Sequence, residues 1–278
     1  MPECITRTKR GHFRAPNGRR LSPEDIKRAK SLGIPPAYTD VCVRLNPRAK
    51  LQATATGAKG IKQYFYNKTY VAQQQKKRGR RAGAIDGNAI LKRTENIIRT
   101  GLRDPSTSVH DRKWRSAVAL RLIAMSGIRS GSPEYYKANG SVGAMTLRKK
   151  HVSLSGGSSV KRTTLAFPGK SGVRNNLSIK DPWLHRAFKI LVKHAKGTDS
   201  LLNVRRENIS SILKEHDSAL KLKDLRTCLA MRLYQKFQEK IKTKRPTLST
   251  KALEKAALEA TAKQLGHTPS VCKKYYLL

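Results

Sequence analysis

Four segments of the chain carry cationic side chains and a tyrosine that together could break a phosphodiester bond. Direct attack of a tyrosine on a DNA phosphate creates a five-coordinate transition state with charge on two non-bridging oxygens. The paired N–H groups of a guanidinium suit those oxygens, and a lysine can give a proton to the departing oxygen. A phenol becomes a good nucleophile only where nearby cations favour its phenolate. The segments are Ser126–Gly131 with Arg129, Phe167–Lys170, Leu222–Thr227 with Lys223 and Arg226, and Leu265–Tyr276 with His267.

The charge of the chain indicates the partner on which such chemistry would act. Its 278 residues include 59 Lys plus Arg and 18 Asp plus Glu, for a formal charge of +41. A charge of this size repels itself unless a polyanion binds, and each phosphate that is contacted releases counterions. An anionic membrane surface is the rival partner, but the sequence has no apolar run of spanning length and no lipidation motif. We therefore expect double-stranded DNA as the partner, and no membrane.

The sequence lacks the residue patterns that two other kinds of phosphate chemistry require. Two-metal nucleases need clustered carboxylates, and acidic residues are few here. Gly169-Lys170-Ser171 resembles the end of an ATP-binding P-loop. However, Thr164 stands where its first glycine belongs, and a turn between two strands replaces the strand-then-helix context. The sequence therefore predicts no metal, no ATP and no other cofactor.

The cysteines and the N-terminus indicate the compartment. Cys4, Cys42, Cys228 and Cys272 are scattered without a C-x-x-C pair, which argues against a zinc ribbon and against a disulfide framework, and fits a reducing environment. No apolar run follows the basic N-terminus, so no signal peptide is expected. We expect an intracellular protein that stays with DNA in a nucleus or nucleoid, a viral factory or a virion, and is not secreted.

Elements that could position these residues follow from composition and periodicity. Residues 1–20 are polar and basic, which predicts a flexible arm, and residues 73–83 are charged without apolar periodicity, which predicts a linker. We therefore predict an α+β fold, with a β-rich domain over residues 1–75 and a larger, mainly helical domain over 76–278. In the first domain we expect a helix from Ser22 to about Lys30 and strands over Asp40–Leu45, Leu51–Thr56 and Lys62–Tyr66.

The second domain shows helical spacing with one exception. From Thr163 to Ile179 the pattern is strand, turn, strand, so we expect a β-hairpin with Lys170 at its turn. The helices predicted from apolar spacing are Ile85–Gly101, Lys113–Ser126, Pro182–Ala195, Asn208–Leu213, Asp224–Lys240 and Lys251–Leu265.

In order and spacing, the four segments resemble the small type IB DNA topoisomerases of poxviruses and bacteria. The resemblance runs from about residue 22 to the end, and although each motif alone is weak, their joint order is specific. Further matching runs are Ile34–Val41, Gly60–Tyr66 and Asn139–Val152. It implies a catalytic domain of the kind shared with tyrosine recombinases. It also implies relaxation of supercoiled DNA without ATP or metal, by a protein that acts as a monomer.

The resemblance also implies a role for each candidate residue. Tyr276 forms a 3′-phosphotyrosyl bond, and its place nine residues after His267 selects it over Tyr275. Arg129, Arg226 and His267 stabilise the transition state. Lys170 is the general acid, with Lys223 assisting. The first domain closes over DNA as a clamp. The residues expected to face DNA are Gln63, Tyr64 and Tyr66 in the first domain and Tyr135 in the second. Because side chains alternate along a strand, some of the first three turn toward the core.

Three alternatives stay open at this point. A tyrosine recombinase or integrase uses related chemistry, but it usually carries His-x-x-Arg where Lys223 precedes Arg226. A basic, non-catalytic DNA-packaging protein would leave the ordered Arg, Lys, Arg, His, Tyr series unexplained. Each candidate could also be structural, as a partner of Asp224 in the case of Arg226 or as a helix cap in the case of His267.

The resemblance fails at one place, the end of the chain. Family members continue beyond the nucleophile, whereas only two residues follow Tyr276. We therefore expect the Tyr276 segment to be mobile until DNA binds.

Overall fold

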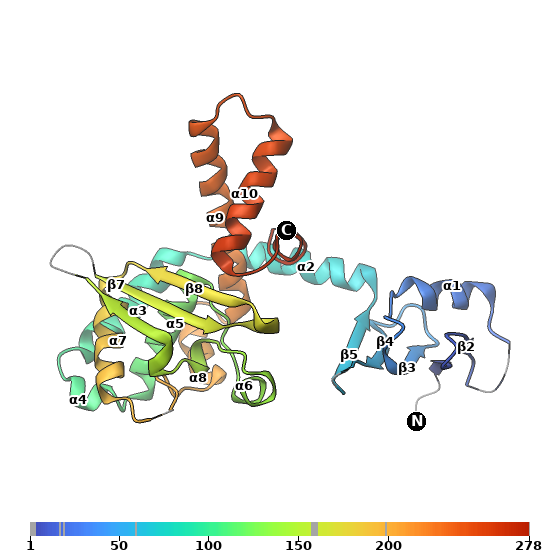
Figure 1. The fold of residues 1–278 in the computed structure, drawn as a ribbon, viewed down its shortest axis with the longest axis horizontal. Helices are drawn as coiled ribbons and strands as arrows, with labels where there is room; N and C mark the ends of the chain where they lie inside the picture. The colour runs from blue at the N-terminus through green and yellow to red at the C-terminus, as the bar shows by residue number, and fades with distance from the viewer. Residues whose placement is uncertain are drawn as a thin grey trace. The chain divides into compact units, whose positions relative to one another are not determined.

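The computed structural model describes residues 4–16, 18, 20–58, 60–156, 161–197 and 199–277. Two compact units make up the chain, Met1–Lys77 and Arg78–Leu278. The first is built on a sheet, and the second is mainly helical with a smaller sheet (Figure 1).

The first unit is an antiparallel five-stranded sheet with one face covered by a helix. The strand order is β2-β1-β3-β4-β5. Helix α1 (Pro23–Ser31) begins where Ser22 Oγ caps it by accepting a hydrogen bond from the Asp25 N–H at 3.0 Å, which confirms the predicted start of this helix. Its Ala29 packs with Ile5, Val43 and other apolar side chains of the sheet. The strands are β1 (Cys4–Arg7), β2 (Phe13–Arg14), β3 (Thr39–Arg44), β4 (Leu51–Thr56) and β5 (Lys62–Tyr66).

The prediction of a flexible N-terminal arm is wrong for most of the described part of residues 1–20. Strand β1 pairs with both β2 and β3, and Ile5 is fully buried in the core of the unit. A single apolar residue among polar ones gave no alternation to detect, and the strand is held by pairing with residues far along the chain.

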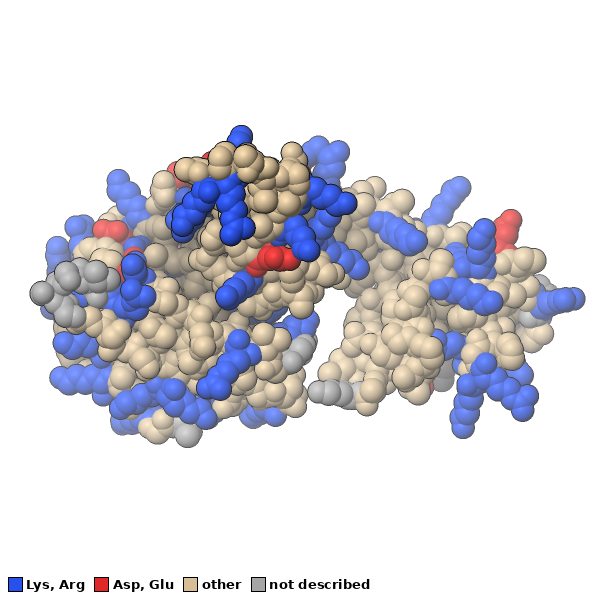
Figure 2. All heavy atoms as spheres, turned by 45° about the horizontal axis from the view of Figure 1, so that its top comes forward, with Lys and Arg blue, Asp and Glu red and all other residues tan. Residues whose placement is uncertain are grey.

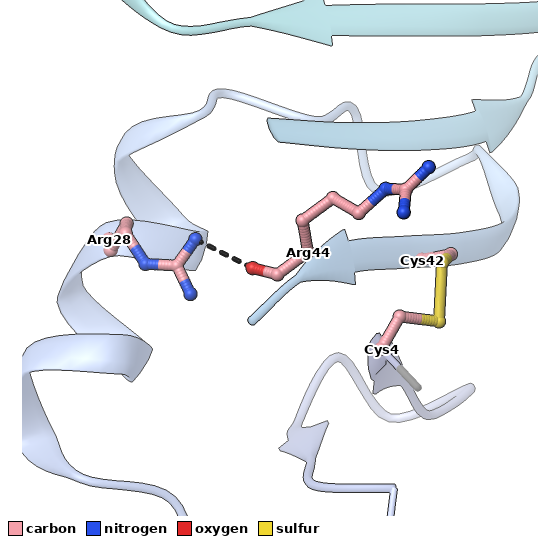
Figure 3. Close-up of a disulfide and its surroundings, with 4 residues drawn as sticks. All are labelled: Cys4, Arg28, Cys42 and Arg44. Carbon is pink, nitrogen blue, oxygen red and sulfur yellow. Dashed lines mark hydrogen bonds between the residues drawn. A yellow bond between two sulfur atoms is a disulfide. The ribbon is translucent and has the colours of Figure 1, made fainter. Parts of the chain in front are cut away.

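The first unit also contains a disulfide, so the expectation that the cysteines are unpaired is wrong for two of the four. Cys4 on β1 and Cys42 on the neighbouring β3 are bonded, with their Cα atoms 5.4 Å apart (Figure 3). The same view shows the Arg28 guanidinium donating to the Arg44 carbonyl at 2.9 Å, which ties α1 to β3. The two cysteines are 38 residues apart in sequence, and only the pairing of their strands brings them together.

The predicted linker over residues 73–83 is helical. Helix α2 spans Lys68–Gly83, and the boundary between the two units falls within it. Gln, Lys, Arg and Ala are good helix formers, so a helix can form here without an apolar stripe. Near its end Ala82 is buried, and Arg81 donates to the Asp224 carboxylate at 2.7 Å.

The second unit packs its helices around α5. This helix is apolar on nearly all sides, with Trp114 and Leu120 among its fully buried residues, as expected of a central helix. The six predicted helices and the predicted strand pairing between residues 163 and 179 are present. The helices are α3 (Gly87–Gly101), α4 (Pro105–Ser108), α5 (Arg112–Ser126), α6 (Pro133–Asn139), α7 (Pro182–His194), α8 (Arg206–Lys214), α9 (Leu222–Lys244), α10 (Thr250–Leu265) and α11 (Pro269–Tyr275), with short 3₁₀ turns η1 (Ala144–Thr146), η2 (Lys149–His151) and η3 (Lys170–Gly172).

A three-stranded antiparallel sheet lies beside these helices. Its order is β6-β7-β8, and η3 occupies the turn between β7 and β8. A buried ion pair joins two of these helices, because Arg121 of α5 contacts Asp181, the residue that caps α7, at 2.7 Å. The strands are β6 (Val152–Ser155), β7 (Arg162–Pro168) and β8 (Arg174–Ile179).

Helices α9 and α10 form an antiparallel pair that stands out from the rest of this unit, with α11 at its base (Figure 1). Within the described ranges, no helix has the length and apolarity needed to cross a membrane.

Candidate active site

Arg226 is the most firmly held of the candidate residues. It is 5% exposed in the second turn of α9. Its guanidinium donates to the Gly127 carbonyl and, at 2.6 Å, to the Leu265 carbonyl. An arginine has five N–H donors, so three remain, including a buried Nε–H that has no partner among the described residues. Part of this remaining capacity goes to Tyr276, whose side-chain hydrogen bond raises the pKa of the guanidinium.

Burial lowers the pKa of Arg226 to about 10, against the opposing attraction of the nearby Tyr276. The guanidinium therefore stays charged at neutral pH. Its charge is poorly solvated, which strengthens its interaction with any anion that reaches it.

Tyr276 and His267 are stacked face to face beside this guanidinium. Their ring centroids are 4.9 Å apart with an angle of 8° between the planes, and the Arg226 Cζ lies 5.3 Å from the tyrosine centroid. Tyr276 is 6% exposed and packs with Leu233 and Leu265 at the base of the α9–α10 pair. The expected mobile segment is thus packed into the protein in this structure.

A glycine turn and a short helix bring the two rings together. Helix α10 ends at Gly266, whose φ of 64° lies in the left-handed region that glycine favours. The chain then turns into α11, where Thr268 caps the helix by accepting from the Val271 N–H at 3.3 Å. At the other end the Tyr276 N–H donates to the Cys272 carbonyl at 3.0 Å, which fixes the backbone of the tyrosine.

His267 sits in an unusual electrostatic setting. Burial, followed by the charge of Arg226, lowers its pKa to about 4, and Arg129 acts in the same direction. The ring is therefore neutral at pH 7. Both ring nitrogens are buried, and an interaction with the Thr268 backbone opposes part of the fall in pKa. One of them carries a proton that an incoming phosphate oxygen could accept.

Arg129 lies in the loop that follows α5, close to Arg226. The loop is fixed through its backbone, because the Arg129 carbonyl accepts from the Ala144 N–H at 2.8 Å. Its charge lowers the pKa of both Arg226 and His267, which indicates that the three groups are near one another. Arg129 and Arg226 also line the same small hollow, together with Gly127, Gly169, Asn175 and Leu265.

Lys170 and Lys223 form a more open part of the site. Lys170 is exposed in η3 and makes no hydrogen bond or ion pair within the described part of the chain. Lys223 Nζ lies 6.0 Å from the centre of the Tyr275 ring. Desolvation by the surrounding protein is the largest cause that lowers the pKa of Lys223, and the charge of Arg78 is the second. The charges of Lys170 and Arg129 add to this effect. The two lysines are therefore close enough to repel each other.

Arg226 does not pair with Asp224, the partner considered for it in a structural role. Asp224 pairs with Arg81, which approaches it through Nε at 2.7 Å and a second nitrogen at 3.2 Å. Asp224 also accepts from the Lys221 N–H at 3.1 Å and so fixes the start of α9. Arg226 is left to the carbonyls and the tyrosine.

The residues predicted to face DNA differ in their exposure and in the side of the strand or helix on which they lie. Tyr64 and Tyr66 are 54% and 46% exposed on one side of the edge strand β5. Gln63 lies on the other side, as alternation requires, with its amide 3.4 Å from the Ile61 carbonyl. Tyr135, on α6 of the second unit, is 61% exposed.

Three contributors to the site give no signal in the sequence. Two are backbone carbonyls, of Gly127 and Leu265, whose type carries no signal. The third is Asn175, which lines the hollow beside both arginines. It stands in an ordinary strand pattern, and only the contacts in space single it out.

Comparison with known proteins decides the family. Residues 88–276, more than half of the chain, match the family model for the catalytic core of eukaryotic DNA topoisomerase I. Residues 12–57 match the model for the N-terminal domain of bacterial DNA topoisomerase IB. The chain belongs to the type IB DNA topoisomerase family. It is an isomerase that acts on DNA.

Viral topoisomerases are among its relatives. DNA topoisomerase 1B of Acanthamoeba polyphaga mimivirus is 29% identical over 298 residues, which cover 100% of this topoisomerase and 86% of the mimivirus protein. DNA topoisomerase 1B of vaccinia virus is 29% identical over 251 residues, covering 88% and 76% of the two chains. DNA topoisomerase 1 of rabbit fibroma virus is 25% identical over 255 residues, covering 89% and 77%.

Proposed function

We propose that this topoisomerase relaxes supercoiled duplex DNA by cutting one strand through Tyr276, letting the cut strand rotate, and resealing it. The contact of Tyr276 with both His267 and Arg226 carries the proposal. Residues from two separate parts of the sequence meet there, and each has a role in attack on a phosphate.

In the cleavage step the Tyr276 oxygen bonds to phosphorus and the bond from phosphorus to the 5′-oxygen breaks. The phenol loses its proton to solvent, and the 5′-oxygen gains one from the enzyme. The product is a 3′-phosphotyrosyl bond and a free 5′-hydroxyl. Religation is the reverse: the hydroxyl attacks phosphorus and the tyrosine leaves.

Arg129, Arg226 and His267 stabilise the charge on the non-bridging oxygens. The two arginines line one hollow, and Arg226 keeps three N–H donors beyond those given to carbonyls. A buried ring nitrogen of His267 adds a further donor. Fixed donors of this kind typically contribute about 10²–10³ in rate each, because they need no reorganisation as charge develops.

Lys170 is the proton donor for the 5′-oxygen, and Lys223 assists. Lys170 is exposed and unpaired within the described residues, so it can reach a DNA strand lying over the hairpin turn. Lys223, with its lowered pKa, parts with a proton more readily than an ordinary lysine.

Neither ATP nor a metal is required in this scheme. The phosphotyrosyl bond conserves the energy of the phosphodiester, and relaxation is downhill because it releases torsional stress. Guanidinium, imidazole and ammonium groups supply the charge stabilisation and the proton.

The wider surface holds the duplex. Tyr64 and Tyr66, with Gln63 at their side, contact DNA from the first unit, which closes as a clamp, and Tyr135 contacts it from the second, whose fold is that of the tyrosine recombinases. Lysines and arginines are spread over the face drawn in Figure 2, with few acidic residues among them. The enzyme acts as a monomer, inside the cell or particle that holds its DNA.

A plasmid assay tests the proposal. Supercoiled plasmid is incubated with the enzyme in EDTA, beside Tyr276→Phe and the neighbouring Tyr275→Phe. We expect relaxation by the wild type and by Tyr275→Phe, and none by Tyr276→Phe. The covalent adduct is then trapped and its peptide sequenced. A phosphate on Tyr275, or relaxation by Tyr276→Phe, would overturn the assignment.

A further inference from the structure

Asn175 is wedged between the turn that carries Lys170 and the turn that carries His267. It is 9% exposed on β8, where it pairs with Phe167 of β7. A Cβ atom built on Gly169 would lie 2.2 Å from its Nδ2, and one built on Gly266 would lie 2.0 Å from its Oδ1. No side chain fits at either glycine, so the amide touches both backbones directly.

On the hairpin side, Asn175 braces the turn. Its Nδ2 donates to the Val173 carbonyl at 2.9 Å, and the same carbonyl accepts from the Gly169 N–H at 2.8 Å. These two bonds close the loop around η3. Asn175 thereby helps to hold the turn in which Lys170 stands.

On the helix side, Asn175 rests on Gly266, which lies between two residues of the site. Leu265, just before it, accepts from Arg226 through its carbonyl, and His267 follows. Gly266 has a φ of +64°, so its backbone adopts the left-handed conformation of a turn. A shift of this turn would therefore move the acceptor of Arg226 and the ring of His267 together.

We infer that Asn175 is a positioning residue, which sets the distance between the proton donor and the groups that bind the non-bridging oxygens. The inference rests on the proposed function, in which Lys170 protonates the 5′-oxygen. Without the wedge, the hairpin turn can move relative to the helices. A misplacement of about 1 Å can cost on the order of 10²-fold in rate.

The test uses two suicide DNA substrates, one ordinary and one with sulfur in place of the scissile 5′-oxygen. Sulfur leaves without needing a proton, so a defect in proton delivery is suppressed on it. For Asn175→Ala we expect cleavage to fall about 10–10²-fold on the ordinary substrate and to recover most of that loss on the sulfur substrate. In combination with Lys170→Ala it should add little to the single variant, because both act on one step.

Three further variants make the result specific. Asn175→Asp keeps the shape but replaces the donor to Val173 by an acceptor, so we expect the same pattern as for Asn175→Ala. It also serves if the alanine variant does not fold. Asn176→Ala, at the exposed neighbouring position, should match the wild type on both substrates. Lys170→Ala alone tests the general acid.

The outcomes separate the inference from the proposed function. If Lys170→Ala is equally impaired on both substrates, the proposed role of Lys170 fails. If Lys170→Ala recovers on sulfur but both Asn175 variants do not, or if they cleave the ordinary substrate at the wild-type rate, the proposed role of Asn175 is overturned. A loss in Asn175→Ala that multiplies fully with that of Lys170→Ala also overturns it.

Discussion

The two sides of the candidate site are built differently. On the helix side, Arg226, His267 and Tyr276 are packed against one another with little or partial exposure to solvent. On the hairpin side, Lys170 is exposed and unpaired within the described residues, and it repels Lys223. The nucleophile and the phosphate-binding groups are thus assembled by folding, whereas the two lysines need an anion between them.

The free-energy cost of burying charged side chains explains why the two sides of the site differ. Burying Arg226 is tolerable because two carbonyls accept from it and the tyrosine lies alongside. Burying two lysines side by side would desolvate two like charges without a partner, which is far more costly. A DNA phosphate removes that repulsion, so the hairpin side is completed by the substrate.

The largest effect is expected at Arg226. Arg226→Ala should reduce cleavage about 10²–10³-fold, through the loss of a transition-state donor. It also leaves the Gly127 and Leu265 carbonyls without their donor, so the free energy of unfolding should fall by about 1–3 kcal/mol. Single-turnover cleavage and urea denaturation measure the two effects.

Lys170→Ala is the matched control from the other side. We expect a comparable fall in cleavage on the ordinary substrate but an unchanged free energy of unfolding, because the side chain is exposed. Equal destabilisation by the two variants would erase the distinction between the packed and the open side.

The ion pair between Arg81 and Asp224 should support the helix side. Asp224 is almost fully buried, and Arg81→Ala leaves its carboxylate uncompensated. We expect a loss of about 3 kcal/mol of unfolding free energy, with cleavage also reduced because Lys223 and Arg226 stand on the same turns of α9. Arg93→Ala breaks the exposed pair with Glu215 and should cost about 0–1 kcal/mol. If the two variants lose the same stability, Arg81 does not anchor the site.

A smaller effect concerns pH. His267 has a pKa of about 4 in the folded protein, below its ordinary value of 6.5. The unfolded chain therefore binds an extra proton between these values, and stability should fall as pH drops from about 6.5 toward 4.

The matched variant isolates this term. His267→Asn should lose less stability than the wild type between pH 7 and pH 5, by about 1 kcal/mol or 2–4 °C in Tm, since the ring is only half-buried. His151, whose pKa burial also lowers, is present in both proteins and cancels. Parallel curves of Tm against pH for the two proteins would show that His267 does not titrate as described.

The sequence predicted those parts of the molecule that depend on local pattern. Six helices of the second unit and strands β3, β4 and β5 followed from periodicity and turn residues, whereas the short helices α4, α6 and α11 were not predicted. The catalytic candidates came from types and spacing. Helix α2 was missed because a helix rich in Lys, Arg and Gln need not show an apolar stripe. Strand β1 and the Cys4–Cys42 bond were missed because distant strands make them.

The contacts that organise the site could not be predicted for the same reason. Arg226 is held by carbonyls 99 and 39 residues away. Asn175 acts through two glycines, of which Gly266 lies far along the chain. Glycine and carbonyl groups occur everywhere, so only the folded chain shows which of them touch a catalytic candidate.

Hydrogen exchange tests most directly the claim that the Tyr276 side is built before DNA arrives. The amides of Cys272, Tyr276 and Leu277 donate to backbone carbonyls at 2.9, 3.0 and 3.2 Å. Exchange across residues 266–277 and 168–175 is compared with and without a duplex that cannot be cleaved. We predict clear protection of 266–277 in the free enzyme, little changed by DNA, and a larger gain on DNA around the Lys170 turn. Unprotected exchange at 272–277 until DNA binds would contradict the account.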